Sequence, residues 1–571
     1  MKSPTERRWI IAPPCDDPSE SIAWASICGL PCIAELLKRK KFGCTDDVHA
    51  FLQPQLRSLA DPFLLPNMAV AVERILAAID RRERIVLFGD YDVDGVTSLA
   101  LLAGILRSYG AEPGLFLPLR MEEGYGLSPE SVERCCEEHR PQLLIAVDCG
   151  TASLSEIAGL KSRGVDVIVF DHHEPKSELP DCVALVNPKT EAGSAFQYLC
   201  SVGIVFKLCH ALLKTRPAPG FDLKANLDLV ALGTVADIVP LERENRVLVR
   251  KGMQQLAASK RPGLRKLMQL AAVRSPVAAH DIGFRLGPRL NAAGRLATAE
   301  KALRLLLTSD EAEANELAAL LDVQNRERQE VERRILAEAE EQLATTFDAA
   351  RDAAIVLGSR EWHPGVLGIV ASRLARQHHR PTILVAFDST GLGKGSGRSI
   401  EGLSLVEALG LCAEHLQKFG GHEMAAGLAV HEDKFAEFAG AFRKAARELL
   451  SDEALEPRLR IDHELTLRQL NHELLRWHQT LEPFGSGNAQ PMFFARQVEP
   501  AVEPQILKEK HLSLRLRQQN YVQRAIYFDG ATSPLPEPPW DIAFRVNADE
   551  YQGLTRLQIQ IEALRAAAPI G

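Results

Sequence analysis

The chain has 571 residues, of which 46% are hydrophobic and 25% charged, a composition that excludes disordered, collagen-like and fibrous proteins. Its length predicts roughly three to five domains. The net charge of −8 excludes a protein that is basic throughout, but not one that binds nucleic acid through a local cationic surface.

The first 60 residues are predicted to form an N-terminal extension, with a helical stretch that ends in the basic run 38–41. From about residue 83 onward, strands and helices alternate. Four apolar runs predict strands: 85–88, 115–118, 143–147 and 165–170. Ser128 and Pro129 are typical of a helix start. Continuous apolar strands alternating with helices are typical of a parallel sheet covered on both faces, so we predict an α/β domain over residues 61–305.

A long connecting helix is predicted over residues 306–348, which are rich in Glu, Ala, Leu and Arg and contain no Gly or Pro. Thr308 and Glu311 have the spacing of a capping box at its start. Residues 349–452 are predicted to form a second, smaller α/β domain, with strands at 353–357 and 382–387.

The last part of the chain, residues 453–571, has a different period. Apolar and polar residues alternate at 512–517, 542–546 and 557–561. This period is typical of half-buried antiparallel strands, and we predict a small β-barrel. Arg515 and Arg517 share one face of their strand, where they could follow a phosphate backbone.

Targeting signals and membrane spans are not predicted. No apolar run approaches the roughly 20 residues that a transmembrane helix needs, and residues 1–14 lack the apolar core of a secretory signal. The eleven cysteines, from Cys15 to Cys412, have neither a disulfide-scaffold nor a zinc-site spacing. We therefore expect a cytoplasmic protein that does not associate with a membrane.

Acidic and imidazole side chains follow three of the predicted strands directly. A helix-like run that begins at residue 226 brings a further carboxylate. In open parallel sheets, the reactive groups lie at the edge formed by the carboxyl ends of the strands. The side chains at this edge are Asp90, Asp92 and Asp94 after 85–88, Asp148 after 143–147, His172 and His173 after 165–170, and Asp237.

Carboxylates that converge on one edge repel one another unless cations lie between them. Two divalent ions about 3.5–4 Å apart would resolve this and create a site that cleaves phosphoesters. Asp148, on the middle motif, is suited to bridge the ions. Asp92 and Asp94 are two residues apart, so an extended loop would direct one to each ion. Oxygen and imidazole donors favour Mn²⁺ or Mg²⁺ over zinc.

Structural roles are the alternative for each of these residues taken singly. An aspartate after a strand is usually a helix cap or a turn residue, and a His-His pair alone is more often a surface or core feature. Asp90 in particular could only brace the turn at Gly89. Their joint occurrence at three strand ends favours the metal site.

Four motifs resemble those of the DHH phosphoesterase superfamily, at residues 90–95, 147–150, 171–173 and 233–237. Three further segments refine the resemblance. Residues 287–295 resemble the signature of the RecJ single-stranded-DNA exonucleases, 420–427 the glycine-rich motif of DHHA1 domains, and 481–488 the segment near the C-terminal OB-fold of RecJ proteins. The resemblance covers about residues 60–571.

This resemblance implies a Mn²⁺- or Mg²⁺-dependent exonuclease that degrades single-stranded DNA 5′→3′ and releases 5′-mononucleotides in recombination and repair. It implies a DHH domain, a DHHA1 domain and an OB-fold that binds DNA. The implied metal ligands are Asp92, Asp94, Asp148, His172 and Asp237, with Asp90 as a further candidate. Asp148 and His173 would act in catalysis, His173 at the scissile phosphate. One departure is Phe88, where some superfamily members have a histidine.

The resemblance also implies a pocket for a terminal 5′-phosphate, with Ser396 and Arg398 and a contribution from Arg120. Tyr125 could stack on a base or pack on its own loop. Arg289 and Arg295 either contact the DNA backbone or brace a domain interface. His422 lies in a glycine cluster that either cradles phosphate or forms a structural turn.

Other functions stay open at this point. A pyrophosphatase, or a phosphodiesterase for oligonucleotides or cyclic dinucleotides, needs the two α/β domains but not the last 110 or so residues. A non-catalytic DNA-binding scaffold would require missing ligands, and all four motifs are intact. The expected partners are single-stranded DNA with a 5′ end and, in addition, a helicase and a single-strand-binding protein. No feature indicates an oligomer.

Overall fold

The structure is a computed structural model that describes residues 7–13, 27–120, 122–296, 298–349, 351–551 and 554–568. Parts of the expected N-terminal extension (1–6 and 14–26, with Cys15) lie outside these residues. The chain divides into two compact units. We call residues 54–330 and 483–489 the central unit, and residues 1–53, 331–482 and 490–571 the flanking unit.

The central unit is built on a five-stranded, wholly parallel sheet in the order β3-β2-β4-β5-β6. Its strands are β2 (Ile85–Phe88), β3 (Gly114–Phe116), β4 (Leu143–Val147), β5 (Asp166–Phe170) and β6 (Ala184–Val186). Val147 lies beside Phe170, so β4 and β5 end level with each other. This confirms the predicted parallel sheet and adds β6.

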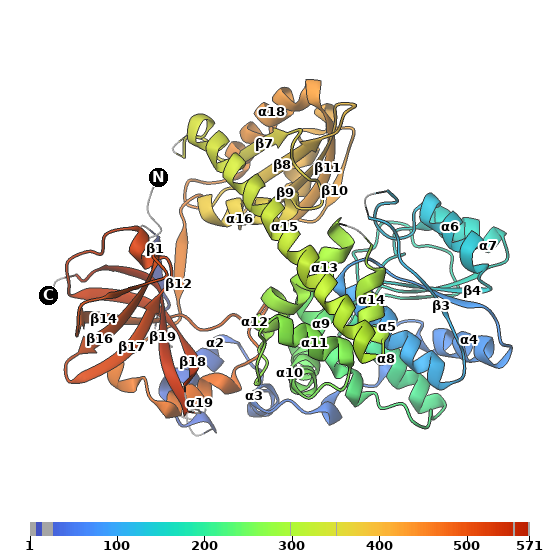
Figure 1. The fold of residues 1–571 in the computed structure, drawn as a ribbon, viewed down its shortest axis with the longest axis horizontal. Helices are drawn as coiled ribbons and strands as arrows, with labels where there is room; N and C mark the ends of the chain where they lie inside the picture. Colours follow the sequence, from blue (N-terminus) through green and yellow to red (C-terminus); the bar gives the residue numbers. More distant parts are fainter. Residues whose placement is uncertain are drawn as a thin grey trace. The chain divides into compact units, whose positions relative to one another are not determined.

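Helices cover both faces of this sheet, as Figure 1 shows for α6 and α7 on one side and α4, α5 and α8 on the other. Leu87 packs into one core cluster and Val86 and Phe88 into the other, because successive strand residues point to opposite faces. The helices are α4 (Met68–Asp80), α5 (Val93–Ser108), α6 (Pro129–His139), α7 (Leu154–Ser162), α8 (Ser201–Thr215), α9 (Leu227–Ala236), α10 (Arg243–Ala257), α11 (Pro262–Leu270), α12 (Ala279–Asp281), α13 (Gly287–Leu296) and α14 (Glu300–Leu307).

Several shorter elements complete the unit. A π-helix, η6 (Ile282–Leu286), joins α12 to α13, and 3-10 turns lie at η2 (Leu56–Ser58), η3 (Pro62–Leu64), η4 (Pro188–Thr190) and η5 (Lys224–Asn226). The Ser128 hydroxyl caps α6 by accepting the Ser131 N–H at 3.1 Å, as predicted.

The long helix α15 (Glu311–Thr346) is present as predicted, but its cap differs. The Asp310 carboxylate accepts the Glu313 N–H at 2.8 Å, and Thr308 ends the preceding helix α14. The predicted capping box of Thr308 and Glu311 is therefore wrong, because Asp310 lies directly before the first turn and supplies the oxygen itself.

A second five-stranded sheet lies in the flanking unit and has the order β10-β11-β9-β8-β7. Only β7 and β8 pair in parallel. The elements are β7 (Ile355–Ser359), β8 (Thr382–Phe387), β9 (Leu392–Arg398), β10 (Lys418–Gly421), β11 (Ala425–His431), α16 (Leu367–His378), α17 (Leu405–Gly410), η7 (Ala413–His415), η8 (Glu432–Lys434) and α18 (Phe435–Leu449).

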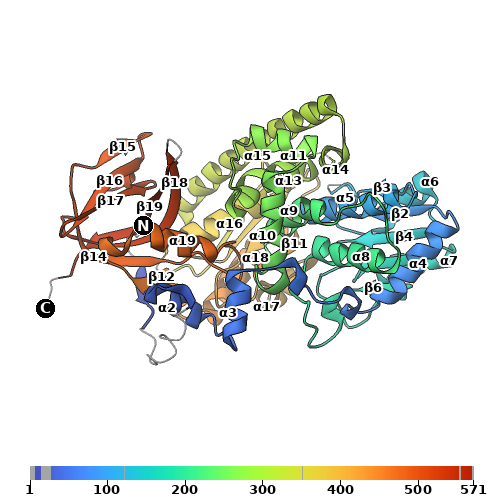
Figure 2. The ribbon, with the colours of Figure 1, turned by 90° about the horizontal axis from the view of Figure 1, so that it is seen from below.

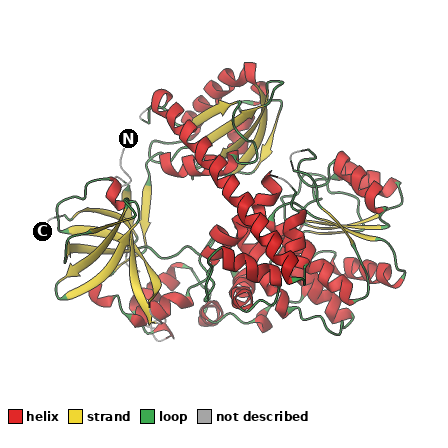
Figure 3. Ribbon diagram, viewed as in Figure 1, coloured by secondary structure: helices red, strands yellow, loops and turns green. Residues whose placement is uncertain are grey.

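The C-terminal strands form the predicted barrel, which Figures 2 and 3 show from two sides. Pairing of β14 with β16 closes the order β14-β18-β19-β17-β16 into a ring. The elements are β12 (Arg458–Ile461), β13 (His463–Glu464), β14 (Phe493–Pro500), β15 (Gln505–Leu507), β16 (His511–Gln518), β17 (Tyr521–Tyr527), β18 (Trp540–Tyr551), β19 (Leu554–Ala566), η9 (Leu467–Gln469), α19 (His472–Thr480) and η10 (Gly530–Thr532).

The N-terminal residues also belong to this unit. Strand β1 (Arg8–Ile11) pairs in parallel with β12, and α2 (Pro31–Arg39) and α3 (Thr45–Leu52) follow. Among the described residues no single helix is long and apolar enough to span a membrane; residues 56–64 and 68–80 meet that test only as a pair bent by 82°.

Candidate metal centre

The first acidic loop follows β2 and ends in a capped helix. Asp92 Oδ1 accepts the N–H groups of Asp94 at 2.9 Å and of Gly95 at 3.1 Å, so Asp92 is the N-cap of α5. Asp94 therefore lies in the first helical turn, and the predicted extended loop is wrong, because the Asp92 cap starts the helix before Asp94. A Cβ on Gly95 would come within 2.5 Å of the Asp90 carbonyl oxygen, so only glycine allows this close approach.

The start of α8 holds two carboxylates of this site. The backbone N–H groups of Ser201 and Val202 donate to the two oxygens of Asp94, at 2.7 and 2.9 Å. The Ser201 hydroxyl donates to Asp148 Oδ1 at 2.8 Å. A helix N-terminus favours negative charge, so α8 stabilises both side chains. The sequence analysis did not single out Ser201, because no local pattern marks it.

Asp148 follows β4 with a φ of +64°, an unusual value for a residue other than glycine. Its N–H donates to the Phe170 carbonyl at 2.9 Å, and its own carbonyl accepts the Tyr125 hydroxyl at 2.6 Å. Backbone strain of this kind is common at functional sites.

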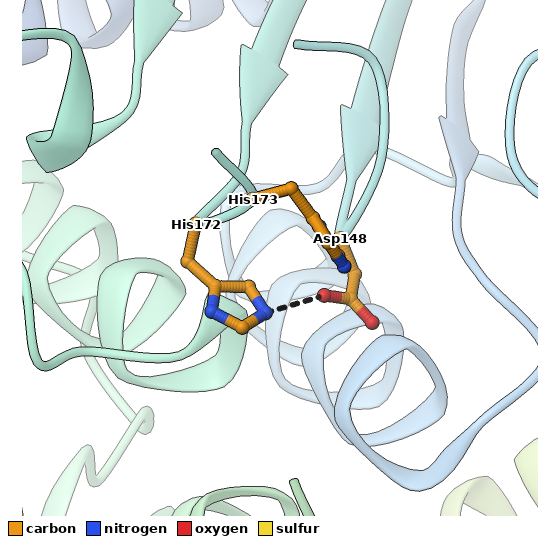
Figure 4. A group of neighbouring side chains, drawn as sticks. All are labelled: Asp148, His172 and His173. Atoms are coloured by element: carbon orange, nitrogen blue, oxygen red, sulfur yellow. Dashed lines mark ion pairs between the residues drawn. The ribbon is translucent and has the colours of Figure 1, made fainter. Parts of the chain in front are cut away.

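His172 lies close to three carboxylates that come from three other elements. Figure 4 shows its ion pair with one of them, Asp148. Its Nε2 atom is 3.4 Å from Asp148 Oδ1, 3.5 Å from Asp237 Oδ2 and 3.9 Å from Asp94 Oδ2. Asp237 ends α9, as the sequence analysis expected. The fold thus brings together side chains up to 143 positions apart, the separation of Asp94 and Asp237 in the numbering.

The ligand atoms form three groups, each with all atoms within 4.8 Å of one another, and Asp148 is the one residue that two of the groups share. Asp148 belongs to two of them, as a bridging ligand would, and Asp92 and Asp94 fall in different groups. The groups are Asp148, His172 and His173; Asp94, Cys200 and Asp237; and Asp90, Asp92 and Asp148. The Cys200 thiol, from the N-cap of α8, was not among the expected ligands.

The burial and mutual repulsion of these carboxylates are suited to a bound divalent cation. Burial, and then the charge of Asp92, raises the pKa of Asp94 to about 7. Burial and the neighbouring carboxylates likewise raise the pKa values of Asp148 and Asp237. Buried oxygens of Asp90 and Asp237 have no hydrogen-bond donor among the described residues. These oxygens are free to coordinate a metal, which would remove the repulsion.

Asp171, which is not one of the expected metal ligands, positions the His173 ring. The His173 Nδ1 atom is 2.7 Å from Asp171 Oδ1, and Asp171 also accepts the N–H groups of Thr151 and His172. Burial opposes the charged imidazole, but the hydrogen bond and charge of Asp171 raise the pKa of His173. Despite its burial, Asp171 has a lowered pKa because of the two histidines. The sequence analysis named Asp171 only as part of a motif.

Arg120 and Tyr125 also lie at this site. The Arg120 guanidinium is 4.8 Å from the centre of the Tyr91 ring, which meets the Tyr125 ring edge-on at 6.4 Å. The Tyr125 hydroxyl is 3.1 Å from the His173 ring nitrogens, and its ring is half-exposed. Tyr125 therefore contacts the site rather than only its own loop.

Helix α13 braces the acidic loop. Asn291 Oδ1 accepts the Val93 N–H at 3.1 Å, and a Cβ on Gly294 would lie 2.6 Å from the Tyr91 carbonyl oxygen. Arg289 donates to Asp322 of α15 at 2.9 Å and to the Arg285 carbonyl at 2.7 Å, which agrees with a bracing role. Arg295 lies half-buried in the last turn of α13.

The flanking unit contains three further predicted site residues: Ser396, Arg398 and His422. Arg398 donates to the Ser396 hydroxyl at 3.2 Å and to the Gly397 carbonyl at 2.7 Å, on one face of β9. The exposed His422 donates its N–H to the Ala425 carbonyl at 2.8 Å, which closes the turn between β10 and β11. The structural turn, one of the two alternatives for His422, is thus observed.

Family models match three parts of the chain. Residues 84–234 match the DHH family N-terminal domain, residues 351–451 the DHHA1 domain, and residues 461–563 the RecJ OB domain. Two curated relatives are each called single-stranded-DNA-specific exonuclease RecJ. The protein of Dickeya dadantii is 36% identical over 90% of this chain and 93% of its own length. That of Bacillus subtilis is 36% identical over 90% of this chain, which spans only 65% of the longer relative.

Solved structures agree with these matches. RecJ of Thermus thermophilus in complex with Mn²⁺ is 32% identical, with a TM-score of 0.84 over 99% of this chain and 80% of that one. The same protein in complex with Mg²⁺ is aligned at 30% identity, with a TM-score of 0.76 over 98% and 79%.

Proposed function

The chain belongs to the RecJ family of DHH phosphoesterases, and we propose that it is a metal-dependent exonuclease that degrades single-stranded DNA from the 5′ end. The observation that carries this proposal is the convergence of Asp94, Asp148 and Asp237 around His172 Nε2, within 3.9 Å. The donor set fits Mn²⁺ or Mg²⁺, which the Thermus relative is described as binding.

Two ions would be held by the groups described above. Asp148 is the candidate ligand for both, since it belongs to two of the three groups, and Asp90, Asp92, Asp94, His172 and Asp237 would be the other ligands. When bound, such ions make a water molecule acidic and offset the charge of a phosphate. Ser201 and the N–H groups of α8 keep the carboxylates oriented.

His173 would act on the scissile phosphate. Asp171 pairs with the His173 Nδ1 atom and favours the charged imidazole, and a charged imidazole can donate a charge-assisted hydrogen bond to a phosphate oxygen. Tyr125 would hold the ring and offer a partly exposed face to a base.

Ser396 and Arg398 of the flanking unit would bind the 5′ end, and Arg120 of the central unit is a separate candidate for phosphate binding. A guanidinium beside a hydroxyl is suited to a terminal phosphate. We expect Arg398→Ala to reduce the preference for 5′-phosphorylated over 5′-hydroxyl oligonucleotides, and Arg376→Ala, an exposed arginine of α16, to leave it unchanged. An unchanged preference in Arg398→Ala would exclude Arg398 from the pocket.

The remaining assignments concern longer substrates and partners. The OB barrel would hold the strand beyond the cleavage site, and Arg289, Arg295 and His422 are further candidates for backbone contacts. A helicase and a single-strand-binding protein would supply and protect the strand. The ten described cysteines are all free, which supports a reducing, cytoplasmic location.

The decisive experiment uses single- and double-stranded oligonucleotides labelled at the 5′ or the 3′ end, with Mn²⁺, Mg²⁺ or chelator. We expect mononucleotides from the 5′ end of single strands only, and none with chelator. Asp148→Asn should remove nearly all of the activity while the chain stays folded by circular dichroism. Cleavage of dinucleotides without degradation of longer strands would contradict the proposal.

A further inference from the structure

Ile238, directly after Asp237, has a left-handed backbone conformation that isoleucine rarely adopts. Its φ is +61°, and its N–H donates to the Val235 carbonyl at 3.3 Å, which ends α9. Glycine is the usual residue at such a position, because a β-branched side chain is strained there. The chain therefore keeps an unfavourable residue next to a carboxylate of the metal centre.

Burial in the core does not explain why an isoleucine occupies this position. Its side chain is 73% exposed, the most exposed of the large hydrophobic residues that the structure describes. Its neighbours Val235 and Val239 pack against the main core, and Leu241 is only 2% exposed. The loop is anchored by the residues around Ile238, while the Ile238 side chain itself points out of the core.

A distant segment fixes this loop. Residues 483–489 form a tight turn in which Gly485 and Asn488 exchange backbone hydrogen bonds at 2.9 and 3.1 Å. The Leu241 N–H donates to the Ser486 carbonyl at 2.8 Å, and a Cβ on Gly487 would lie 3.0 Å from Pro240 Cβ. Strained residues persist where the surrounding structure holds them, and they cluster at functional sites.

We propose that Ile238 is a substrate-contacting residue that packs against the sugar or base of the nucleotide next to the scissile phosphate. This inference rests on the proposed nuclease function. A phosphodiester at the metal centre places a nucleoside within reach of the residue that follows Asp237. An exposed apolar side chain there gains contact area only when the nucleoside covers it, since a base offers an apolar face irrespective of sequence.

Two substitutions separate this role from a structural one. Ile238→Gly and Ile238→Asn both suit a left-handed backbone, so the melting temperature should stay the same or rise. With Mn²⁺ and a 5′-phosphorylated single strand, kcat/KM should fall about tenfold, because one apolar side chain in contact with a substrate has effects of this order. Mn²⁺ affinity, measured by titration calorimetry, should change less than about twofold. Ile238→Leu should retain most of the activity.

Ala272 provides a matched control. It is exposed, lies in the same unit and has a φ of +51°, so Ala272→Gly relieves similar strain away from the carboxylates. We expect this variant to gain stability and keep its kcat/KM. An unchanged kcat/KM in Ile238→Gly, or a parallel loss of Mn²⁺ affinity, would overturn the substrate contact. A wild-type chain that binds Mn²⁺ but cleaves no DNA would instead overturn the proposed function.

Discussion

At the scale of single residues, the start of α8 decides how the carboxylates are presented. Ser201 contacts both Asp94 and Asp148, through its N–H and its hydroxyl. Without these donors, the two side chains would lose hydrogen bonds that orient their oxygens in a buried site. Loss of a group that orients a metal ligand in this way typically lowers metal affinity or activity about 10–100-fold.

We therefore expect Ser201→Ala to lower Mn²⁺ affinity or turnover by about 10–100-fold. Ser201→Thr, which keeps the hydroxyl, should recover much of the loss. Titration calorimetry with Mn²⁺ measures the affinity, and kcat is measured at saturating metal. If alanine and threonine behave alike, the hydroxyl does not position Asp148.

At the scale of elements, α13 shows how one helix supports another. Its Asn291 accepts the Val93 N–H, and its Gly294 lets it approach the backbone of Tyr91. On its other side, Arg289 pairs with Asp322 of α15. The motif at residues 287–295 thus supports the acidic loop, in addition to any contact with DNA.

Asn291→Ala should leave the Val93 N–H without its acceptor, at a cost of about 1–3 kcal/mol in the free energy of unfolding. Asn291→Asp keeps an acceptor at this position and should be less harmful. Urea denaturation, followed by Mn²⁺ titration of the folded variants, checks both effects. Equal stability of the alanine variant and the wild type would show that the hydrogen bond contributes nothing.

Helix α19 carries a buried imidazole with a predictable effect of pH. His478 is 2% exposed, and burial lowers its pKa to about 4. Since the pKa in the unfolded chain is about 6.5, the unfolded state binds a proton between these values that the folded state does not. This contribution to stability is complete above about pH 6.5 and is lost as the pH falls towards 4.

At a pH of about 4.5, the free energy of unfolding should be about 2–3 kcal/mol lower than at neutral pH because of His478. His478→Leu should remove this part of the pH dependence, while His472→Leu, at the exposed start of the same helix, should keep it. Denaturant unfolding at the two pH values gives the comparison. A pH dependence that is the same in His478→Leu and the wild type would contradict the assignment.

At the scale of the whole molecule, the carboxylates of the metal centre all belong to the central unit, yet residues 483–489 of that unit come from the C-terminal part of the chain. Deleting everything after residue 455 would therefore remove the turn that contacts Leu241 as well as the barrel. Such a truncation would not isolate the contribution of the barrel, whereas substitutions on its surface would.

We expect Mn²⁺ binding to protect the central unit, but not the barrel, against hydrogen exchange. A metal that binds only the folded state stabilises it by about 2.7 kcal/mol at roughly 100 times its dissociation constant. Hydrogen exchange should slow in α5, α8 and α9 and stay unchanged in β16–β19. Asp148→Asn should abolish the protection. Equal protection of the barrel strands would place a metal outside the proposed centre.

Local sequence patterns were sufficient to predict four of the five strands of the sheet and most of the acidic edge. Apolar runs such as 143–147 and the acids that follow them are local patterns, and a parallel sheet brings such strand ends together whatever the details of packing. The helical position of Asp94 was not predicted. An aspartate at position 92 fits both a helix cap and a metal ligand, and the sequence does not distinguish the two roles.

The residues that support that edge became apparent only from the three-dimensional packing. Ser201, Cys200 and Asn291 reach the site from parts of the chain that carry no acidic pattern of their own, and Ser486 contacts Leu241 in the loop after Asp237. Their hydrogen bonds depend on how helices and loops distant in sequence pack together. Periodicity and spacing describe neighbours along the chain, whereas the contacts that hold Asp148 and Ile238 in strained conformations arise from packing in three dimensions.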